Sequence, residues 1–436
     1  MIYYTMGNTP TGEARDLLVL LPTDRDREEL DEVHEEYELH WFEDEDFDYP
    51  QPGTDFDMVE YTERASEYVE EADIDGVLFS HDVANLVAGV LVDRHDLPGP
   101  GLEPVFLADH KYYSRKHQPN VPWFDYIDLE TGEWGEEPQF PAYVKPPYLT
   151  MTLLQYRVEN REEYDDAMEI IERELPKYTS PFIDFFEAYV DTEAYPLATE
   201  ETLLVEEPLE DWTQHCVEGW VDPDGELHVW AISDHNYYDD GSLAIDNYST
   251  PSTLPADAQE ELIDIATDAI RQHGFEQSFW NVEIFRLPDR HVITEVNGRT
   301  ASVWEPLYQG AFDTSVYEGI VHLHADRPER TEAVQPDWTP EPETDRMGIQ
   351  FHVVTFGEGP AEDFFDFEYA RSVPDTDVEI FVEPGEEIEQ TRTSGFWLAR
   401  FHLFGEDYDE MLARADEIRA NMLKQPDLSP EPERYQ

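Results

Sequence analysis

The sequence predicts a mixed α/β and α+β fold, with an N-terminal open α/β domain, a central domain and a C-terminal lobe. Two short apolar runs, Leu17–Leu21 and Gly76–Ser80, are typical of strands buried in a parallel sheet. In the centre of the chain, a helical pattern is followed by two strand-like segments that each carry a carboxylate. Beyond a proline-rich linker at Pro336–Pro342, three more strand patterns and an amphipathic helix follow.

These patterns suggest domain boundaries. We expect the N-terminal domain to span residues 1–103, the central domain 104–335 and the C-terminal lobe 343–425, with a flexible tail at 426–436. In the first domain, a helix over Val83–Arg94 should follow the second apolar run. Strand, helix and strand with short connections indicate a small open sheet.

The composition is extremely acidic. The 436 residues include 27 basic and 102 acidic side chains, a formal net charge of −75, yet 40% are hydrophobic and 13% aromatic. The chain should therefore fold, and acidic residues spread along its length fit a salty cytoplasm in which ions screen self-repulsion. The absence of a basic patch argues against nucleic-acid partners.

Other features also favour a soluble cytoplasmic protein. The single cysteine, Cys216, cannot form an internal disulfide, in agreement with a reducing compartment. The start of the sequence has no secretory-signal pattern. No stretch approaches the roughly 20 apolar residues that a membrane helix needs, so we expect no membrane partner.

The first half of the central domain should contain a lysine-terminated strand. Tyr143–Lys145 has a strand pattern, and Leu153–Val158 is its expected hairpin partner. Asn160 and Glu163 form a capping pattern at the start of an amphipathic helix. A further strand is expected at Leu203–Glu207.

The second half should begin with a hairpin. His215–Val221 and Leu227–Ser233 flank the turn Asp222–Gly225. A helix over Pro255–His273 should end at Gly274. In the C-terminal lobe, three strands and a closing helix are predicted at Gly348–Thr355, Val378–Val382, Gly395–Leu403 and Tyr408–Met422.

The most informative pattern follows the Pro255–His273 helix. Glu283 lies in one strand-like segment, and Glu295, Asn297 and Arg299 lie in the next, after a turn at Leu287–Arg290. Because a strand alternates its faces, the last three should point to one side, where Glu283 can join them. Hard oxygen ligands with one cation suit Mg²⁺ on a triphosphate and a transferred phosphoryl group.

In this order of elements, the chain resembles the ATP-grasp superfamily, especially its carboxylate–amine ligases. The resemblance covers nearly the whole chain and rests first on the Glu-x-Asn-x-Arg run at 295–299. It implies ATP and Mg²⁺ (or Mn²⁺) as cofactors, with the metal held by Glu283, Glu295 and Asn297. It implies catalytic roles for Arg299 and Lys145.

Softer matches imply the nucleotide site. The run Phe140–Pro146 is similar to the family strand whose lysine reaches the phosphates, and Asp109–Tyr112 is similar to the helix start with a second lysine. Val205–Leu209 resembles the adenine-reading segment, with Gln214 near the ribose. The nucleotide-binding residues implied in this way are Lys111, Lys145, Glu206, Glu207, Leu209 and Gln214.

Lysine usage strengthens this interpretation. The chain has only five lysines, and two of them, Lys111 and Lys145, stand where the family places its phosphate-binding lysines. A lysine offers a compact charge suited to a phosphate oxygen, whereas arginine is a planar fork.

The chain departs from the family in two connections. The family's Gly-rich phosphate loop is replaced by Pro146–Thr152, which contains no glycine and would close through the Thr150 and Thr152 hydroxyls. Arg299 is followed by Thr300–Ser302 rather than a Pro-Gly-Gly type of run, which leaves the acceptor substrate open.

Three other groups are possible functional candidates. His322 and His324 lack a suitable third ligand, so a packed structural role is favoured. Cys216 is expected in the core rather than as a nucleophile. The run Asp234–Tyr238 should follow a central strand, either touching substrate or forming an ordinary polar loop.

The resemblance implies an ATP-dependent ligase that joins a small-molecule carboxylate to an amine through an acyl phosphate, releasing ADP and phosphate. It is also compatible with a homodimer. One alternative keeps the fold but carries out a biotin-carboxylase-like or kinase-like reaction. Another is a nucleotide-binding regulator without turnover.

Overall fold

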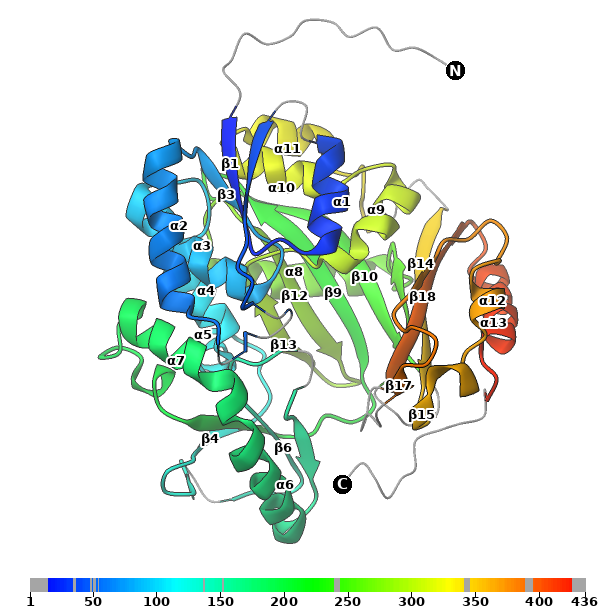
Figure 1. Ribbon diagram of the computed structural model, residues 1–436, viewed down its shortest axis with the longest axis horizontal. Coiled ribbons are helices and arrows are strands. Elements are labelled where there is room, and N and C mark those ends of the chain that lie inside the picture. Colours follow the sequence, from blue (N-terminus) through cyan, green and yellow to red (C-terminus); the bar gives the residue numbers. More distant parts are fainter. Residues whose placement is uncertain are drawn as a thin grey trace, which may run out of the picture.

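The structure is a computed structural model that describes residues 15–33, 37–47, 49, 52–53, 55–135, 138–150, 153–238, 244–340, 346–388 and 395–425. The predicted tail at 426–436 and Thr152 lie outside these residues. The predicted mixed fold is confirmed: helices cover open sheets throughout Figure 1.

The N-terminal region is built on a parallel sheet, as the apolar runs predict. Its strand order is β2-β1-β3, and Leu17 and Leu18 of β1 are fully buried. Helices α3 and α10 both contact β3. The elements are β1 (Arg15–Leu20), α1 (Asp24–Val33), β2 (Tyr37–Phe42), α2 (Met58–Ala72), β3 (Gly76–Leu78), α3 (Asp82–His95), α4 (Leu102–Asp109) and α5 (Lys111–His117).

A second, antiparallel sheet carries the predicted lysine strand. Its order is β5-β4-β8-β6-β7, and α6 and α7 connect β7 to β8 in the lower part of Figure 1. The predicted cap of α6 is confirmed, because the Asn160 side chain accepts from the Glu162 and Glu163 amides. The elements are β4 (Phe124–Asp128), β5 (Glu133–Trp134), β6 (Ala142–Lys145), β7 (Tyr156–Val158), α6 (Arg161–Glu174), α7 (Pro176–Tyr189), η2 (Pro196–Ala198) and β8 (Thr202–Glu206).

A large antiparallel sheet forms the centre of the molecule, in the order β13-β12-β9-β10-β11-β14-β18-β16. Helix α8 packs on β9, β10 and β12 and ends at Gly274, whose φ of 77° suits glycine. The elements before the linker are β9 (Thr213–Val221), β10 (Leu227–Tyr237), β11 (Ile245–Thr250), α8 (Ala256–His273), β12 (Phe279–Arg286), β13 (His291–Asn297), η3 (Ser302–Trp304), α9 (Glu305–Phe312), α10 (Val316–His324) and α11 (Pro328–Val334).

The C-terminal strands continue this sheet, since β14 pairs with β11 as well as with β18. They bury a hydrophobic core of their own, distinct from the core that spans the N-terminal and central regions. In Figure 1 they lie on the right, with α12 and α13 outside them. The elements are β14 (Met347–Thr355), β15 (Gly359–Pro360), η4 (Ala361–Asp363), α12 (Phe367–Ala370), β16 (Val378–Ile380), β17 (Glu387–Ile388), β18 (Phe396–Gly405) and α13 (Tyr408–Met422).

Two local predictions are wrong. Residues 234–237 belong to β10 and do not follow it, because the strand continues in register against Ser249, Tyr248 and Asn247 of β11. The strand that carries Glu295 ends at Asn297, so the alternation of faces does not extend to Arg299.

Candidate functional site

The two predicted metal carboxylates face each other across neighbouring strands. Glu283 of β12 pairs with Glu295 of β13, and Asn281 pairs with Asn297 in the same register. Directly opposed residues share a sheet face, with Cβ atoms about 5 Å apart. A bulge leaves Thr294 without a register partner on β12 and puts Glu295 opposite Glu283.

Glu283 is a carboxylate without a full counter-charge. Its Oε2 accepts a hydrogen bond of 2.6 Å from Gln214 Nε2. Burial and the charge of Glu295 raise the pKa of Glu283 to about 8, although Arg299, Lys111 and Gln214 act in the opposite direction. A raised carboxyl pKa shows that the environment disfavours the charged form.

Lys111 is a predicted phosphate-binding lysine that contacts this carboxylate pair. Helix α5 begins at Lys111, and its Nζ lies 3.4 Å from Glu295 Oε1. The same Nζ donates to the carbonyl oxygen of Leu149 at 3.0 Å, and the Lys111 amide donates to Pro147 O at 2.7 Å. The glycine-free loop is thereby tied to the start of α5 through its carbonyl oxygens.

Packing explains how this loop holds its shape without glycine. Tyr148 is 4% exposed, and its ring lies 5.2 Å from that of Phe182 and 5.9 Å from that of Phe186. The loop is therefore anchored by an aromatic side chain. Thr150 lines the site cavity described below.

A second charged cluster lies on the antiparallel sheet of β4–β8. Glu206 Oε2 is 2.6 Å from Lys145 Nζ, and its Oε1 accepts from Arg115 Nε at 2.5 Å. Burial opposes ionisation, but Arg115 and Lys145 lower the pKa of Glu206 to about 2. Burial lowers the pKa of Lys145, and Glu206 counteracts this.

Arg115 connects the two clusters. Its Nη2 donates to the carbonyl oxygen of Thr294, the bulged residue of β13, at 2.5 Å. One face of α5 therefore carries two cations, since Lys111 and Arg115 are four residues apart. This spacing could have indicated Arg115 from the sequence.

Arg299 joins the hairpin to the N-terminal region. Its Nε donates to Asp82 Oδ1 at 2.5 Å, and Asp82 is the first residue of α3. Burial opposes ionisation of Asp82, but Arg299 lowers its pKa. No sequence motif singles out Asp82, since only the fold brings it into contact with Arg299.

These contacts surround one cavity. Of the predicted site residues, Lys111, Glu295 and Asn297 line it directly. Glu283 and Arg299 adjoin it through Glu295 and Asp82, and Lys145 adjoins it through Glu206 and Arg115. The lining residues are Asp82, Ala108, Asp109, Lys111, Ser114, Arg115, Tyr148, Thr150, Glu295, Val296 and Asn297.

The remaining predicted nucleotide residues have other contacts. Glu207 Oε1 accepts from the Trp123 amide at 2.9 Å and from Arg290 Nη2 at 2.8 Å. The carbonyl oxygen of Leu209 accepts from Trp212 Nε1 at 3.1 Å. Gln214 is 5% exposed and bridges Glu283 and the Tyr237 hydroxyl.

A buried acid that the sequence did not single out supports the segment after Arg299. Glu218 Oε1 accepts from Thr300 Oγ1 at 3.0 Å and from the Ala301 amide at 2.9 Å, and its Oε2 accepts from Tyr308. Burial raises the pKa of Glu218 to about 7, against these three donors. Glu218 therefore fixes the chain immediately beyond Arg299.

The other candidates are accounted for by packing. Cys216 is fully buried, as predicted. His322 Nδ1 lies 2.6 Å from the Tyr37 hydroxyl, and His324 Nδ1 lies 2.7 Å from Val77 O. Asp234 binds His215, Ser252 and Thr253.

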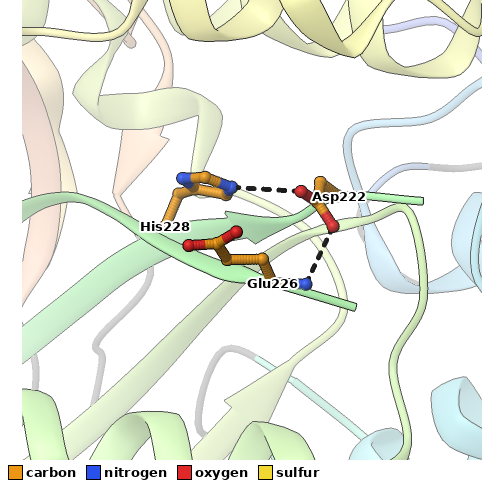
Figure 2. Close-up of side chains that lie close together, drawn as sticks. All are labelled: Asp222, Glu226 and His228. Atoms are coloured by element: carbon orange, nitrogen blue, oxygen red, sulfur yellow. Dashed lines mark hydrogen bonds and ion pairs between the residues drawn. The ribbon is translucent and has the colours of Figure 1, made fainter. Parts of the chain in front are cut away.

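Within the described part of the chain, one group of three acids and histidines has ligand atoms within 4.8 Å of one another: Asp222, Glu226 and His228. Figure 2 shows it at the β9–β10 turn. Asp222 Oδ1 accepts the Asp224 amide at 2.9 Å and the Glu226 amide at 2.8 Å. These hydrogen bonds within the turn account for the proximity of the three side chains.

No helix among the residues that the structure describes is long and apolar enough to cross a membrane.

Comparisons with known proteins identify the fold. Residues 138–305 match the family model of the ATP-grasp domain. No curated protein matches the sequence. Solved structures, among them the three described next, are similar over most of the chain.

An L-amino acid ligase from Bacillus licheniformis is 16% identical, with 94% of this chain and 98% of that chain covered and a TM-score of 0.71. Phosphoribosylglycinamide synthetase from Anaerococcus prevotii is 16% identical, with coverages of 94% and 99% and a TM-score of 0.61. Carboxyaminoimidazole ribonucleotide synthase from Aspergillus clavatus, complexed with ATP, is 13% identical, with coverages of 93% and 97% and a TM-score of 0.64. Residues 138–305 are therefore an ATP-grasp domain, and the chain as a whole has the ATP-grasp fold.

Proposed function

We propose that this protein is an ATP-dependent ligase that joins a carboxylate to an amine through an acyl phosphate, with release of ADP and phosphate. The observation that carries the proposal is the pair Glu283 and Glu295, which face each other beside a cavity that also receives Lys111. Similar folds that carry the names of ligases and synthases, one of them complexed with ATP, support it.

The donor set fits a hard divalent cation. Glu283, Glu295 and Asn297 offer only oxygen ligands, which Mg²⁺ and Mn²⁺ prefer. The raised pKa of Glu283 fits as well, because a cation would supply the missing counter-charge. When bound, Mg²⁺ would offset the negative charge of the terminal phosphates of ATP.

The protein's cations would do the remaining electrostatic work. Lys111, Lys145 and Arg299 would neutralise charge on the terminal phosphates and on the phosphoryl group as the substrate carboxylate attacks it. Glu206 holds Lys145 and Arg115 in fixed positions, so little reorganisation is needed. Positioning and preorganised charge are the main sources of rate in phosphoryl transfer.

The nucleoside end of ATP is assigned to the end of β8, the segment after it and the start of β9. Glu206, Glu207, Leu209 and Gln214 are the proposed contacts there, although Glu206 already binds two cations. The substrates would be small molecules. The −75 net charge supports a high-salt cytoplasm as the working environment.

A thermal-shift titration with Mg·ATP in multimolar KCl tests the nucleotide site. Ligand at about 100 times its dissociation constant should add roughly 2.7 kcal/mol to the free energy of unfolding. We expect this stabilisation in the native chain and its loss in Glu295→Gln. The exposed Glu169→Gln on α6 removes the same charge elsewhere and should behave as the native protein.

ADP release in the presence of acids and amines then tests turnover. A regulator that binds ATP without turnover is the second candidate, favoured by the loop that presents the carbonyl oxygens of Pro147 and Leu149 to Lys111. Stabilisation by Mg·ATP, with no ADP released in the presence of any acid and amine tested, would support the regulator. Absence of stabilisation in a folded protein would refute both.

A further inference from the structure

A pair of asparagines lies beside the carboxylate pair. Asn281 of β12 is two residues before Glu283, and it pairs with Asn297 of β13 in the same register. Both asparagines are buried, with 2% and 8% of their surface exposed. Because residues two apart on a strand share a face, Asn281 lies on the sheet face that carries the proposed metal ligands. The proposed metal site uses Asn297 but gives Asn281 no role.

The hydrogen bonds of Asn281 fix which end of its amide faces each neighbour. Its Nδ2 donates to the carbonyl oxygen of Arg299 at 3.0 Å, and its Oδ1 accepts from Asn297 Nδ2 at 2.9 Å. A backbone carbonyl oxygen can only accept, so the amino group of Asn281 must be the group that binds it. The oxygen of Asn281 therefore faces Asn297, and only the amino group of Asn297 can donate to this oxygen.

This chain of contacts determines which atom of Asn297 remains free for a ligand. With its Nδ2 bound to Asn281, the Asn297 amide turns its oxygen to the other side, and Asn297 lines the cavity together with Glu295. Within the part of the chain that the structure describes, no hydrogen bond to Asn297 Oδ1 is formed. An amide oxygen is a ligand for a hard cation, whereas the amino group of an amide only donates hydrogen bonds.

The carbonyl group that sets this orientation is itself held in place. Glu218 of β9 lies opposite Asn281 in register. It accepts hydrogen bonds from Thr300 Oγ1 and from the Ala301 amide. Asn281 and Glu218 therefore bind the segment immediately beyond β13 from two adjacent strands, so the fold fixes the acceptor on which Asn281 is anchored.

We propose that Asn281 is a positioning residue for the cation site: anchored on the carbonyl oxygen of Arg299, it holds the Asn297 amide with Oδ1 toward the cation. This inference rests on the proposed function, in which Glu283, Glu295 and Asn297 bind the cation. Groups that orient a metal ligand through a hydrogen bond contribute about 10- to 100-fold to metal affinity or activity.

Titration of the nucleotide-free protein with Mn²⁺ in multimolar KCl tests the inference, with free Mn²⁺ followed by electron paramagnetic resonance. Asn281→Leu keeps the approximate size of the side chain but removes both hydrogen bonds. We expect its Mn²⁺ dissociation constant to rise at least about tenfold. Asn421→Leu, at an exposed position of α13, is the matched control and should leave this constant unchanged. Binding that persists in Glu295→Gln comes from other acids and is subtracted.

The same change in an Asn297→Asp background separates amide orientation from a general effect on the strands. A carboxylate has two equivalent oxygens, so one of them can face the cation whichever way the side chain is turned. In this background, Asn281→Leu should not raise the Mn²⁺ dissociation constant by more than about threefold. An equal loss of affinity in both backgrounds would overturn the inference, because it would show that Asn281 acts through strand packing.

The remaining outcomes separate this inference from the proposed function. Unchanged Mn²⁺ affinity in Asn281→Leu would overturn the inference, while ADP release by the native chain would still uphold the ligase. If Glu295→Gln binds Mn²⁺ as well as the native chain does, the inference falls together with the proposed cation site. If Asn281→Leu does not fold, Asn281→Ser, whose single hydroxyl is too short to bond both neighbours, replaces it in both backgrounds with the same expectations.

Discussion

The two charged clusters around the cavity differ in their ratio of cations to carboxylates. In the cluster of Lys145, Glu206 and Arg115, one carboxylate meets two cations, and the pKa of Glu206 falls to about 2. In the cluster of Glu283 and Glu295, two carboxylates meet, and the pKa of Glu283 rises to about 8. In the first cluster the carboxylate has more than one cation, whereas in the second, the unbalanced cluster, two carboxylates share one cation, Lys111, which contacts Glu295.

This difference indicates that the two clusters have separate roles in the site. The cluster around Glu206 is a fixed scaffold that holds Lys145 and Arg115 before any ligand arrives. The unbalanced cluster carries a stored electrostatic cost that a bound cation can remove. Perturbed acids beside a cavity indicate function more strongly than paired ones, which also occur in purely structural networks.

The largest expected effect is on turnover. Glu295→Gln removes a carboxylate of the unbalanced cluster that also contacts Lys111. If ADP release occurs in the native chain, this change should lower kcat by at least about 100-fold, the scale on which catalytic electrostatic groups act. Retention of kcat in Glu295→Gln would show that the hairpin is not the metal site.

Glu206→Gln should produce the largest loss of stability. It leaves the buried Lys145 and Arg115 with a neutral partner, and breaking a buried ion pair from one side costs about 3 kcal/mol. Chemical denaturation in high KCl measures the change. A cost within about 0.5 kcal/mol, as at ordinary surface positions, would refute the scaffold role.

Glu283→Gln should act in the opposite direction in the metal-free protein. The change removes a carboxylate whose ionisation is disfavoured, so the free energy of unfolding should rise by at least about 1 kcal/mol at pH 8, because each unit of pKa shift corresponds to about 1.4 kcal/mol. The same denaturation experiment, with EDTA present, provides the comparison with Glu206→Gln. Destabilisation of similar size in both variants would contradict the claim that the two clusters contribute oppositely to stability.

The two clusters should also have opposite pH dependences. The folded-state pKa of Glu283 is raised from 4.5 to about 8, so its contribution to stability is complete below pH 4.5 and is lost as pH rises through 8. The pKa of Glu206 is lowered to about 2, so its contribution is present above pH 4.5 and is lost as pH falls toward 2. The free energy of unfolding is measured across pH by denaturation of the native chain and of each Gln variant. The difference between the native chain and a variant gives the pH dependence contributed by that residue. Parallel slopes would contradict the contrast.

The smallest effect is expected at the β9–β10 turn. Asp222→Asn weakens two hydrogen bonds that close the turn and should cost about 1 kcal/mol. Asp222 is eight residues along the strand from Gln214, or about 26 Å, so stabilisation by Mg·ATP should be unchanged. Altered stabilisation by Mg·ATP would mean that the turn communicates with the site.

Much of the fold was predictable because its signals are local. The apolar run of β1, the Asn160 cap, the Gly274 stop and the turn between β12 and β13 each depend on a few adjacent residues. The hairpin of β12 and β13 was likewise within reach of the sequence, whereas the direct pairing of Glu283 with Glu295 depends on the bulge at Thr294.

The rest depended on contacts between distant segments. Asp82 meets Arg299 across 217 positions, and Arg115 meets Thr294 across 179. The local periodicity of the sequence does not indicate contacts between residues so far apart in the chain. The bulge at Thr294 and the extension of β10 to Tyr237 are set by the neighbouring strands, and for this reason the prediction that residues 234–237 follow the strand is wrong.

The most direct test of the account is calorimetric titration of the nucleotide-free protein with MgCl₂ at pH 7 in multimolar KCl, in two buffers of different ionisation enthalpy. Because the pKa of Glu283 is about 8, this group is mostly protonated at pH 7, and cation binding should release a proton. We predict saturable binding with proton release in the native chain and loss of the proton release in Glu283→Gln. Binding without proton release, or no binding with an intact Mg·ATP response, would contradict the claim that this cluster is completed by a cation.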